Sequence, residues 1–378
     1  MGQVVNLRPI GNRPPETSST LPGRAVLWTA LALAAFLFAD AAIFRSGWYN
    51  RYLEPDSSAG TPALRLYWLA HMPPLKVPDV MVVGDSRIAE GFSVRAASTA
   101  VDGKFHFENF GMGGSNPRIW YYVLRDADPQ RNRFAAIAIM VTPYSDEDGT
   151  FDEQNTIADL SYSIAELRAG DCLDFARSFD VPDLQRRAFI GCLFKGATLR
   201  RDVQAFLSNM RARLRKTRDW RDHGLGYEEN YGGKPEELSG LSADWTQRTI
   251  HYPPGVTENQ ISTVRDFVMP EHQPQTGALT RYRKLWLGRI LDLYKNSSTR
   301  IIFFELPRAP LPIPQAAIPP RFIDSVHGIR NVTILPPATF RDLERPEIFA
   351  DGLHLNHLGR PIFSAHLAEQ IDAVLGDR

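Results

Sequence analysis

The hydrophobic positions of this 378-residue chain form two kinds of pattern after about residue 77. Short continuous apolar runs are typical of strands that are buried on both faces of a parallel sheet. Runs of this kind lie at Val80–Val83, Phe105–Phe110, Phe134–Val141, Arg300–Leu306 and Val332–Leu335. Segments of helical character lie between and after them, at Val94–Ala100, Arg118–Asp126, Leu279–Tyr294 and Ile362–Leu375. This alternation predicts an α/β fold in which helices cover both faces of a central parallel sheet.

A third pattern lies near the N-terminus, where Ala25–Phe44 is apolar except for Asp40. Its twenty residues are long enough to span a bilayer as a helix. Basic residues precede the segment and aromatic residues follow it, which favours a cytoplasmic N-terminus: Arg8, Arg13 and Arg24, then Trp48, Tyr49 and Tyr52. We therefore predict a single-pass anchor with the remainder exported. A signal peptide cleaved near Ala39-Asp40-Ala41 and a buried core helix are the alternatives.

These patterns divide the chain into four regions. They are a disordered cytoplasmic tail (1–24), the transmembrane anchor (25–44), a connector (45–76) and the α/β domain (77–378). Residues from about 154 to 278 exceed what a crossover connection needs, so they are interpreted as an insertion. Within it, Thr198–Trp220 carries an apolar stripe at helical spacing and many arginines on the opposite faces. Those arginines fit anionic lipid headgroups or an acidic glycan, or they form a solvated face.

Charge and cysteine content exclude few function classes. Lys and Arg total 43, and so do Asp and Glu, so no overall charge selects nucleic acid as a partner. The only cysteines, Cys172 and Cys192, lie 20 positions apart and lack the spacing of a metal site. They form a disulfide if this part of the chain is exported, or they remain two thiols. No cofactor is predicted.

The candidate chemistry begins at Gly84-Asp85-Ser86, where a predicted strand turns into a helix. A serine at the carboxyl end of a parallel strand lies where open α/β sheets bind their ligands. Nucleophilic catalysis by serine needs a base within hydrogen-bonding reach and a carboxylate that orients the base. Asp351 and His354 stand three residues apart in a turn before the last helix, and they would supply both groups.

Three motifs in order resemble the SGNH (GDSL-type) hydrolase superfamily. They are Gly84-Asp85-Ser86, the segment Asn109–Gly114 of the form N-x-G-x-x-G, and the D-x-x-H turn from Asp351 to His354. The resemblance implies a flavodoxin-like α/β/α sandwich that cleaves or transfers acyl esters. It also implies that Ser86 is the nucleophile, that His354 is the base oriented by Asp351, and that the main-chain amides of Ser86 and Gly114 stabilise the oxyanion. Asn109 belongs to the candidate oxyanion and substrate-binding set through the same motif.

One block departs from the family pattern. Members usually supply an oxyanion-hole asparagine in G-x-N-D, whereas the corresponding segment here, Ala135–Gly149, contains no asparagine. Thr142 is the candidate substitute, with Tyr144, Ser145 or a main-chain amide as alternatives. Losing one such donor lowers the rate by ~10²–10³, so slow or degenerate catalysis stays open. Arg308, at the end of a predicted strand, would hold a substrate oxygen or is a solvated loop residue.

A metal site is the rival interpretation of the last turn, because Asp351, His354 and His357 are zinc-type ligands. His354 and His357 are only three residues apart and no third strong ligand motif occurs, so a metal is not predicted. An anchored SGNH-type domain resembles proteins that add or remove acetyl groups on envelope polysaccharides at the bacterial inner membrane, often beside a multi-spanning acyltransferase. We therefore expect a serine esterase or O-acyltransferase on the periplasmic side. A weakly catalytic glycan-binding or assembly subunit and a lipid-directed esterase are the alternatives.

Overall fold

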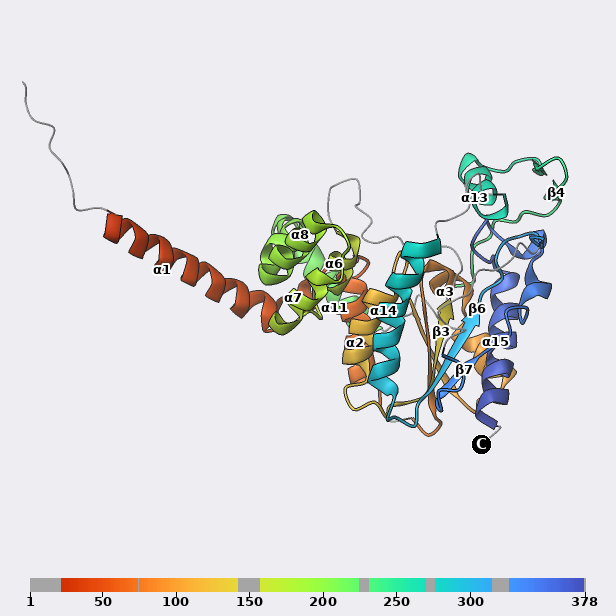
Figure 1. Ribbon diagram of the computed structural model, residues 1–378, viewed down its shortest axis with the longest axis horizontal. Coiled ribbons are helices and arrows are strands. Elements are labelled where there is room, and N and C mark those ends of the chain that lie inside the picture. Colours follow the sequence, from red (N-terminus) through yellow and green to blue (C-terminus); the bar gives the residue numbers. More distant parts are fainter. Residues whose placement is uncertain are drawn as a thin grey trace, which may run out of the picture.

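The computed structural model describes residues 22–73, 75–141, 157–223, 231–269, 276–314 and 326–376, with backbone alone for 22–23 and 276–284. The central sheet has five parallel strands in the order β2-β1-β3-β6-β7 (Figure 1). Their bounds are β1 Asp79–Gly84, β2 His106–Gly111, β3 Phe134–Val141, β6 Arg300–Glu305 and β7 Val332–Ile334. The predicted α/β fold with a central parallel sheet is confirmed.

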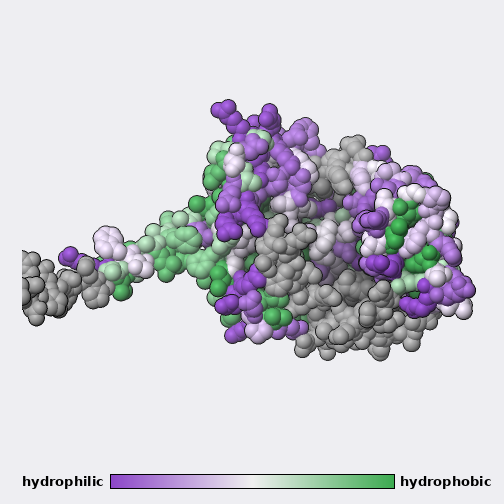
Figure 2. Space-filling view, turned by 90° about the horizontal axis from the view of Figure 1, so that it is seen from above, coloured by the Kyte–Doolittle hydropathy of each residue, from purple (hydrophilic) through white to green (hydrophobic). Residues whose placement is uncertain are grey.

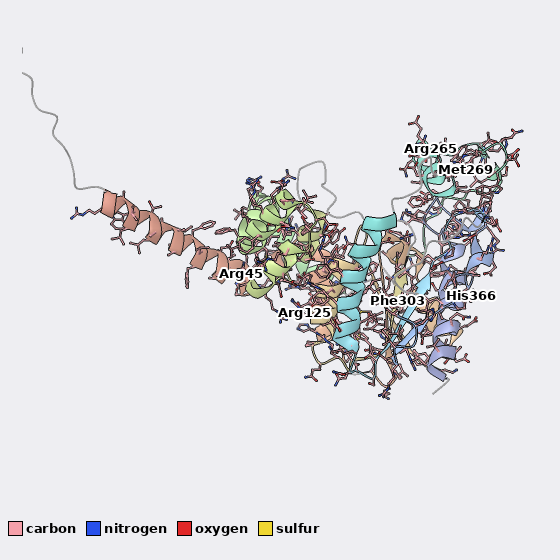
Figure 3. All side chains as sticks on the ribbon, viewed as in Figure 1. Arg45, Arg125, Arg265, Met269, Phe303 and His366 are labelled. Atoms are coloured by element: carbon pink, nitrogen blue, oxygen red, sulfur yellow. A yellow bond between two sulfur atoms is a disulfide. The ribbon has the colours of Figure 1, made fainter. Side chains whose placement is uncertain are left out.

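The sheet forms where the sequence has continuous apolar runs, because helices cover both of its faces. Val80, Met81 and Val82 of β1 are fully buried, and so is most of β3. Helices α2, α5 and α14 lie together on one side of the sheet, and α3, α4 and α15 lie on the other (Figure 1). Their bounds are α2 Gly60–His71, α3 Ser86–Gly91, α4 Val94–Ala100, α5 Pro117–Ala127, α14 Thr276–Tyr294 and α15 Gly359–Gly376. Phe303 of β6, labelled in Figure 3, is buried in the core between them.

A compact helical module, residues 157–223, precedes α14 in the chain. It contains α6 Ala158–Ser163, α7 Cys172–Arg177, α8 Pro182–Leu193, α9 Lys195–Thr198, α10 Arg200–Ser208 and α11 Met210–Asp222. Cys172 and Cys192 form a disulfide that joins α7 to α8. Aromatic residues of the module pack with Trp286 of α14 in a second hydrophobic core, so the module is held against the α/β body.

The amphipathic helix expected at Thr198–Trp220 differs from the structure, since Asn209 separates α10 from α11. Asp202 and Arg213 would lie about 16 Å apart along one continuous helix. The break lets the chain fold back, and the Arg213 guanidinium lies 2.8 Å from Asp202 and 2.7 Å from Glu54 of the connector. Arg213 is therefore buried, whereas the other arginines of α10 and α11 are exposed or partly exposed.

The predicted irregular stretch after the module also contains regular structure. A short hairpin pairs β4 Ser242–Asp244 with β5 Thr249–His251, and α13 follows at Glu258–Val268. Helix α13 begins with a capping box. The Thr257 side chain accepts a hydrogen bond from the Gln260 N–H, and the Gln260 side chain accepts one from the Thr257 N–H. In Figure 1 the hairpin and α13 lie at the same end of the molecule, beyond the carboxyl ends of the strands.

Helix α1, Pro22–Asp40, projects from the rest of the structure, and no other helix or strand lies along most of its length (Figure 1). Within the described residues, the stretch Arg24–Arg45 is long and apolar enough to cross a membrane. The hydrophobic colour in Figure 2 runs along α1 to the place where it meets the helical module. There Arg45, labelled in Figure 3, donates to the carbonyl oxygens of Cys192 and Leu193 at 2.6 and 2.7 Å.

Candidate active site

Ser86 is the first residue of α3, directly beyond the carboxyl end of β1. The chain passes from β1 to β2 on one side, and it then crosses to β3 on the other side of β1. The direction of the strand order therefore reverses at β1, which places Ser86 at the topological switch point of the sheet. Asp85 caps α3, because its side chain accepts the Arg87 N–H at 2.9 Å and pairs with the Arg87 guanidinium at 2.7 Å. The cap holds the turn in shape and leaves Ser86 half-buried at the edge of the sheet.

The turn Ala350–Leu355 brings the predicted base to the serine. His354 Nε2 lies 2.9 Å from Ser86 Oγ, and His354 Nδ1 lies 2.9 Å from Asp351 Oδ2. Asp351 Oδ1 also accepts the main-chain N–H groups of Leu353 and His354, each at 2.8 Å. An Nδ1–H bound to the carboxylate leaves Nε2 free to accept the serine proton, as a serine nucleophile requires.

The environment of Asp351 favours its ionised form. Burial acts to raise the pKa of this carboxyl. The hydrogen bonds from His354 and from the Leu353 amide, together with the charge interaction with His354, outweigh burial and lower the pKa to about 2. Lys234 Nζ lies 3.7 Å from Asp351 Oδ2 and adds a positive charge at the outer side of the pair. A carboxylate that stays ionised stabilises the imidazolium formed when His354 takes a proton.

The segment after β2 lies beside Ser86. Gly114 has a φ of 72°, and a side chain on Gly113 would lie 3.8 Å from the Ser86 Cβ. Ser115 Oγ donates to the Gly84 carbonyl at 3.0 Å and accepts from Trp120 Nε1 at 2.8 Å, which ties this segment to the end of β1. Among the described residues, no acceptor is hydrogen-bonded to the Gly114 N–H. The Ser86 N–H is at the start of α3 and therefore has no hydrogen-bond acceptor within that helix.

Two of the remaining candidates are engaged within the fold. The Asn109 amide nitrogen donates to the carbonyls of Ile88 and Phe92 at 3.2 and 3.0 Å, and its oxygen accepts from Gly111 N–H. Asn109 therefore holds the helix that carries Ser86 and does not present its amide to a ligand. Arg308 binds Glu344 at 2.7 and 2.9 Å, so its guanidinium is held in an ion pair beside β6. Thr142, Tyr144 and Ser145 lie outside the described residues.

Residues of α13 support the turn that carries Asp351 and His354, and they were not predicted from the sequence. Gln260 Nε2 donates to the Ala350 carbonyl at 2.7 Å, and the Gly352 N–H donates to Thr263 Oγ1 at 3.2 Å. A side chain at Gly352 would collide with the Thr263 backbone at 2.3 Å, so α13 packs directly on the turn. The Thr257-x-x-Gln260 capping box was the sequence signal that marks this helix.

The comparisons with known proteins add little to this geometry. No protein-family model matches the chain, and no curated protein matches it. Among solved structures, the crystal structure of a possible lipase from Chitinophaga pinensis is 11% identical to this chain, covers 79% of it and 99% of its own chain, and has a TM-score of 0.25. A TM-score of this size carries no argument about activity. Within the described residues, no group of three or more His, Cys, Asp or Glu side chains is placed to hold a metal.

Proposed function

We propose that the protein is a membrane-anchored serine esterase or O-acyltransferase that acts on acyl esters through Ser86, His354 and Asp351. The observation that carries this proposal is the continuous chain of contacts from Asp351 through His354 to Ser86 Oγ, with both links 2.9 Å long. Three side chains that meet in this order activate a serine hydroxyl on many unrelated folds. Helix α1 would hold the α/β body at the bacterial inner membrane with the site on the periplasmic side.

The reaction would proceed in two halves. Ser86 Oγ attacks the acyl carbon while its proton passes to His354 Nε2, and the main-chain N–H groups of Ser86 and Gly114 donate to the developing oxyanion. Collapse of the tetrahedral intermediate breaks the ester bond, and His354 gives the proton to the departing alkoxide. Water or a sugar hydroxyl then attacks the acyl-enzyme, His354 takes its proton, and Ser86 leaves with the proton returned. Thr142 remains the candidate for a third oxyanion donor.

The substrate class is proposed from the resemblance stated above. An acetyl ester of an envelope polysaccharide fits an anchored periplasmic domain, with a multi-spanning membrane acyltransferase as the partner that would supply acyl groups. This assignment is testable separately from the chemistry, because acetyl and octanoyl aryl esters report acyl preference without the natural acceptor.

The deciding experiment labels the purified full chain in detergent with a fluorophosphonate that reacts with activated serines. We expect an adduct on Ser86, located by mass spectrometry, and its loss in Ser86→Ala and His354→Ala. His357→Ala is the matched control, because His357 lies three residues from His354 in the same segment but bonds to the Lys234 carbonyl. A folded wild-type chain that remains unlabelled would instead favour a glycan-binding or assembly subunit.

A further inference from the structure

The helical module contains an open hollow of about 330 Å³, and none of the candidate active site residues lines it. Ile157, Leu160 and Ile190 form apolar parts of its lining, and Arg187, Arg200 and Arg201 also line it. Arg200 and Arg201 are exposed, and Arg187 lies 3.9 Å from Asp183. Three arginines around an apolar floor suit a ligand that joins an anionic group to hydrocarbon.

The position of α1 places this hollow at a membrane surface. Side chains from Val26 to Phe38 of α1 are largely exposed, and residues 22–38 would span about 26 Å as a helix, close to the hydrocarbon thickness of a bilayer. The module contacts the C-terminal end of α1, from Phe36 to Asp40. Phe194 packs against Phe36 with the two rings tilted and their centroids 5.9 Å apart, and Asp40 accepts the Gly196 N–H at 2.8 Å.

The same contacts explain the single acidic residue of the apolar segment. Asp40 is only 5% exposed because α9 covers it, so its carboxylate is satisfied by the module at the end of the span. The end of α8 and the start of α9 are thus fixed beside the last turns of α1, and the same two helices line the hollow through Ile190, Gly191 and Ala197. The hollow therefore lies at the depth of lipid headgroups, if α1 spans the membrane as proposed.

The outer face of α8 is apolar next to the hollow. Its inner stripe, Leu184, Ala188 and Cys192, is buried in the module. Phe189 and Ile190 on the other side are 37% and 48% exposed. Exposed apolar side chains with neighbouring arginines are typical of an interfacial helix that lies in the headgroup region of a membrane.

We propose that the hollow binds the phosphodiester headgroup of an anionic phospholipid, with the acyl chains lying along Phe189, Ile190 and α1. The guanidinium groups of Arg187, Arg200 and Arg201 donate to the phosphate oxygens, while the apolar floor covers the glycerol backbone. This site would seat the module on the membrane and fix the height of the α/β body above it. Ser86 does not line this hollow, so lipid binding there can be tested independently of the proposed acyl chemistry.

Native mass spectrometry of the full chain in detergent tests this site, with added phosphatidylglycerol or phosphatidylcholine. Wild type is expected to retain phosphatidylglycerol in preference to phosphatidylcholine, and Arg200→Gln with Arg201→Gln is expected to lower that retention roughly tenfold. Arg215→Gln with Arg218→Gln removes two exposed charges from α11 outside the hollow and is the matched control, with retention unchanged. Fluorophosphonate labelling of Ser86 should be the same in all of these variants.

Three results would overturn the proposal. Equal losses in both double variants would mean that lipid is attracted by diffuse surface charge. Equal retention of the two lipids would exclude recognition of net headgroup charge. Inorganic phosphate that displaces phosphatidylglycerol, and that binds the wild-type chain equally well without lipid, would make the hollow a site for soluble phosphate.

Discussion

His354 Nε2 lies 2.9 Å from Ser86 Oγ, although the two residues are 268 positions apart in the chain. The contact forms because the turn before α15 folds over the carboxyl end of β1, where α3 begins. Leu355 of that turn would be 3.5 Å from a side chain on Gly91, the last residue of α3. The two halves of the candidate site are therefore packed against each other by apolar contacts and do not depend on a ligand to meet.

Asp351→Asn should leave this packing in place and still remove most activity. Asparagine can accept the same main-chain bonds, but it can also donate to Nδ1 and so favour the tautomer that points a hydrogen at Ser86. We expect kcat on an aryl acetate to fall by about 10³–10⁴. Steady-state kinetics of the full chain measure this, with circular dichroism to verify folding. Activity within threefold of wild type would contradict the role given to Asp351.

Acid should destabilise the protein through the same carboxylate. The folded pKa of Asp351 is lowered from 3.8 to about 2, so its contribution is complete above pH 4 and is lost as the pH falls toward 2. The shift corresponds to about 2 kcal/mol of unfolding free energy. Wild type should thus lose its advantage over Asp351→Asn between pH 5 and pH 2 in denaturant titrations. A difference that stays constant over this range would disprove the linkage.

Gly111 is required for the close approach of β2 to α3. A methyl group there would lie 2.1 Å from the Ala89 nitrogen and 2.7 Å from the Ile88 carbonyl carbon, both main-chain atoms that cannot move aside. Gly111→Ala should therefore lower stability by about 2–3 kcal/mol and displace Ser86, with loss of labelling. Gly170→Ala is the control, since nothing lies within 4 Å of its added carbon. Equal melting temperatures for the two variants would show that the approach is not needed.

Much of the sheet and the candidate triad could be predicted from sequence because both depend on local patterns. Strand β3 was predicted with its observed bounds, Phe134–Val141, since eight successive apolar residues are typical of a strand that is buried on both faces of a sheet. The Ser86 turn and the Asp351–His354 turn each carry a short motif at the end of an element. The parallel sheet puts the carboxyl end of β1 and the start of α15, the α-helix that follows β7, at one edge, which allows the two turns to meet.

Other features depend on contacts between distant residues, so local patterns missed them. The break at Asn209 is stabilised by Arg213 reaching Asp202 and Glu54, which no periodicity reveals. Asn109 belongs to the motif, but whether its amide faced a ligand or α3 was decided by the packing of β2 on α3. The support that α13 gives to Ala350 and Gly352 likewise joins segments about 90 positions apart.

The disulfide should stabilise the helical module more than the candidate active site. Cys172 and Cys192 are buried and close a loop of 20 residues, for which chain entropy predicts about 3 kcal/mol of stabilisation. Arg45 donates a hydrogen bond to the Cys192 carbonyl, so a more mobile α8 would also weaken the contact between the module and the end of the apolar segment. Cys172→Ala with Cys192→Ala should therefore speed hydrogen exchange in α7 and α8, while the Ser86 labelling rate stays within about twofold, since local opening need not spread to a separately packed core. Ile88 and Leu355, which lie close to Ser86 and His354 in the chain, belong to the other hydrophobic core, which does not include the two cysteines. Loss of labelling together with the disulfide would show that the two cores unfold as one unit.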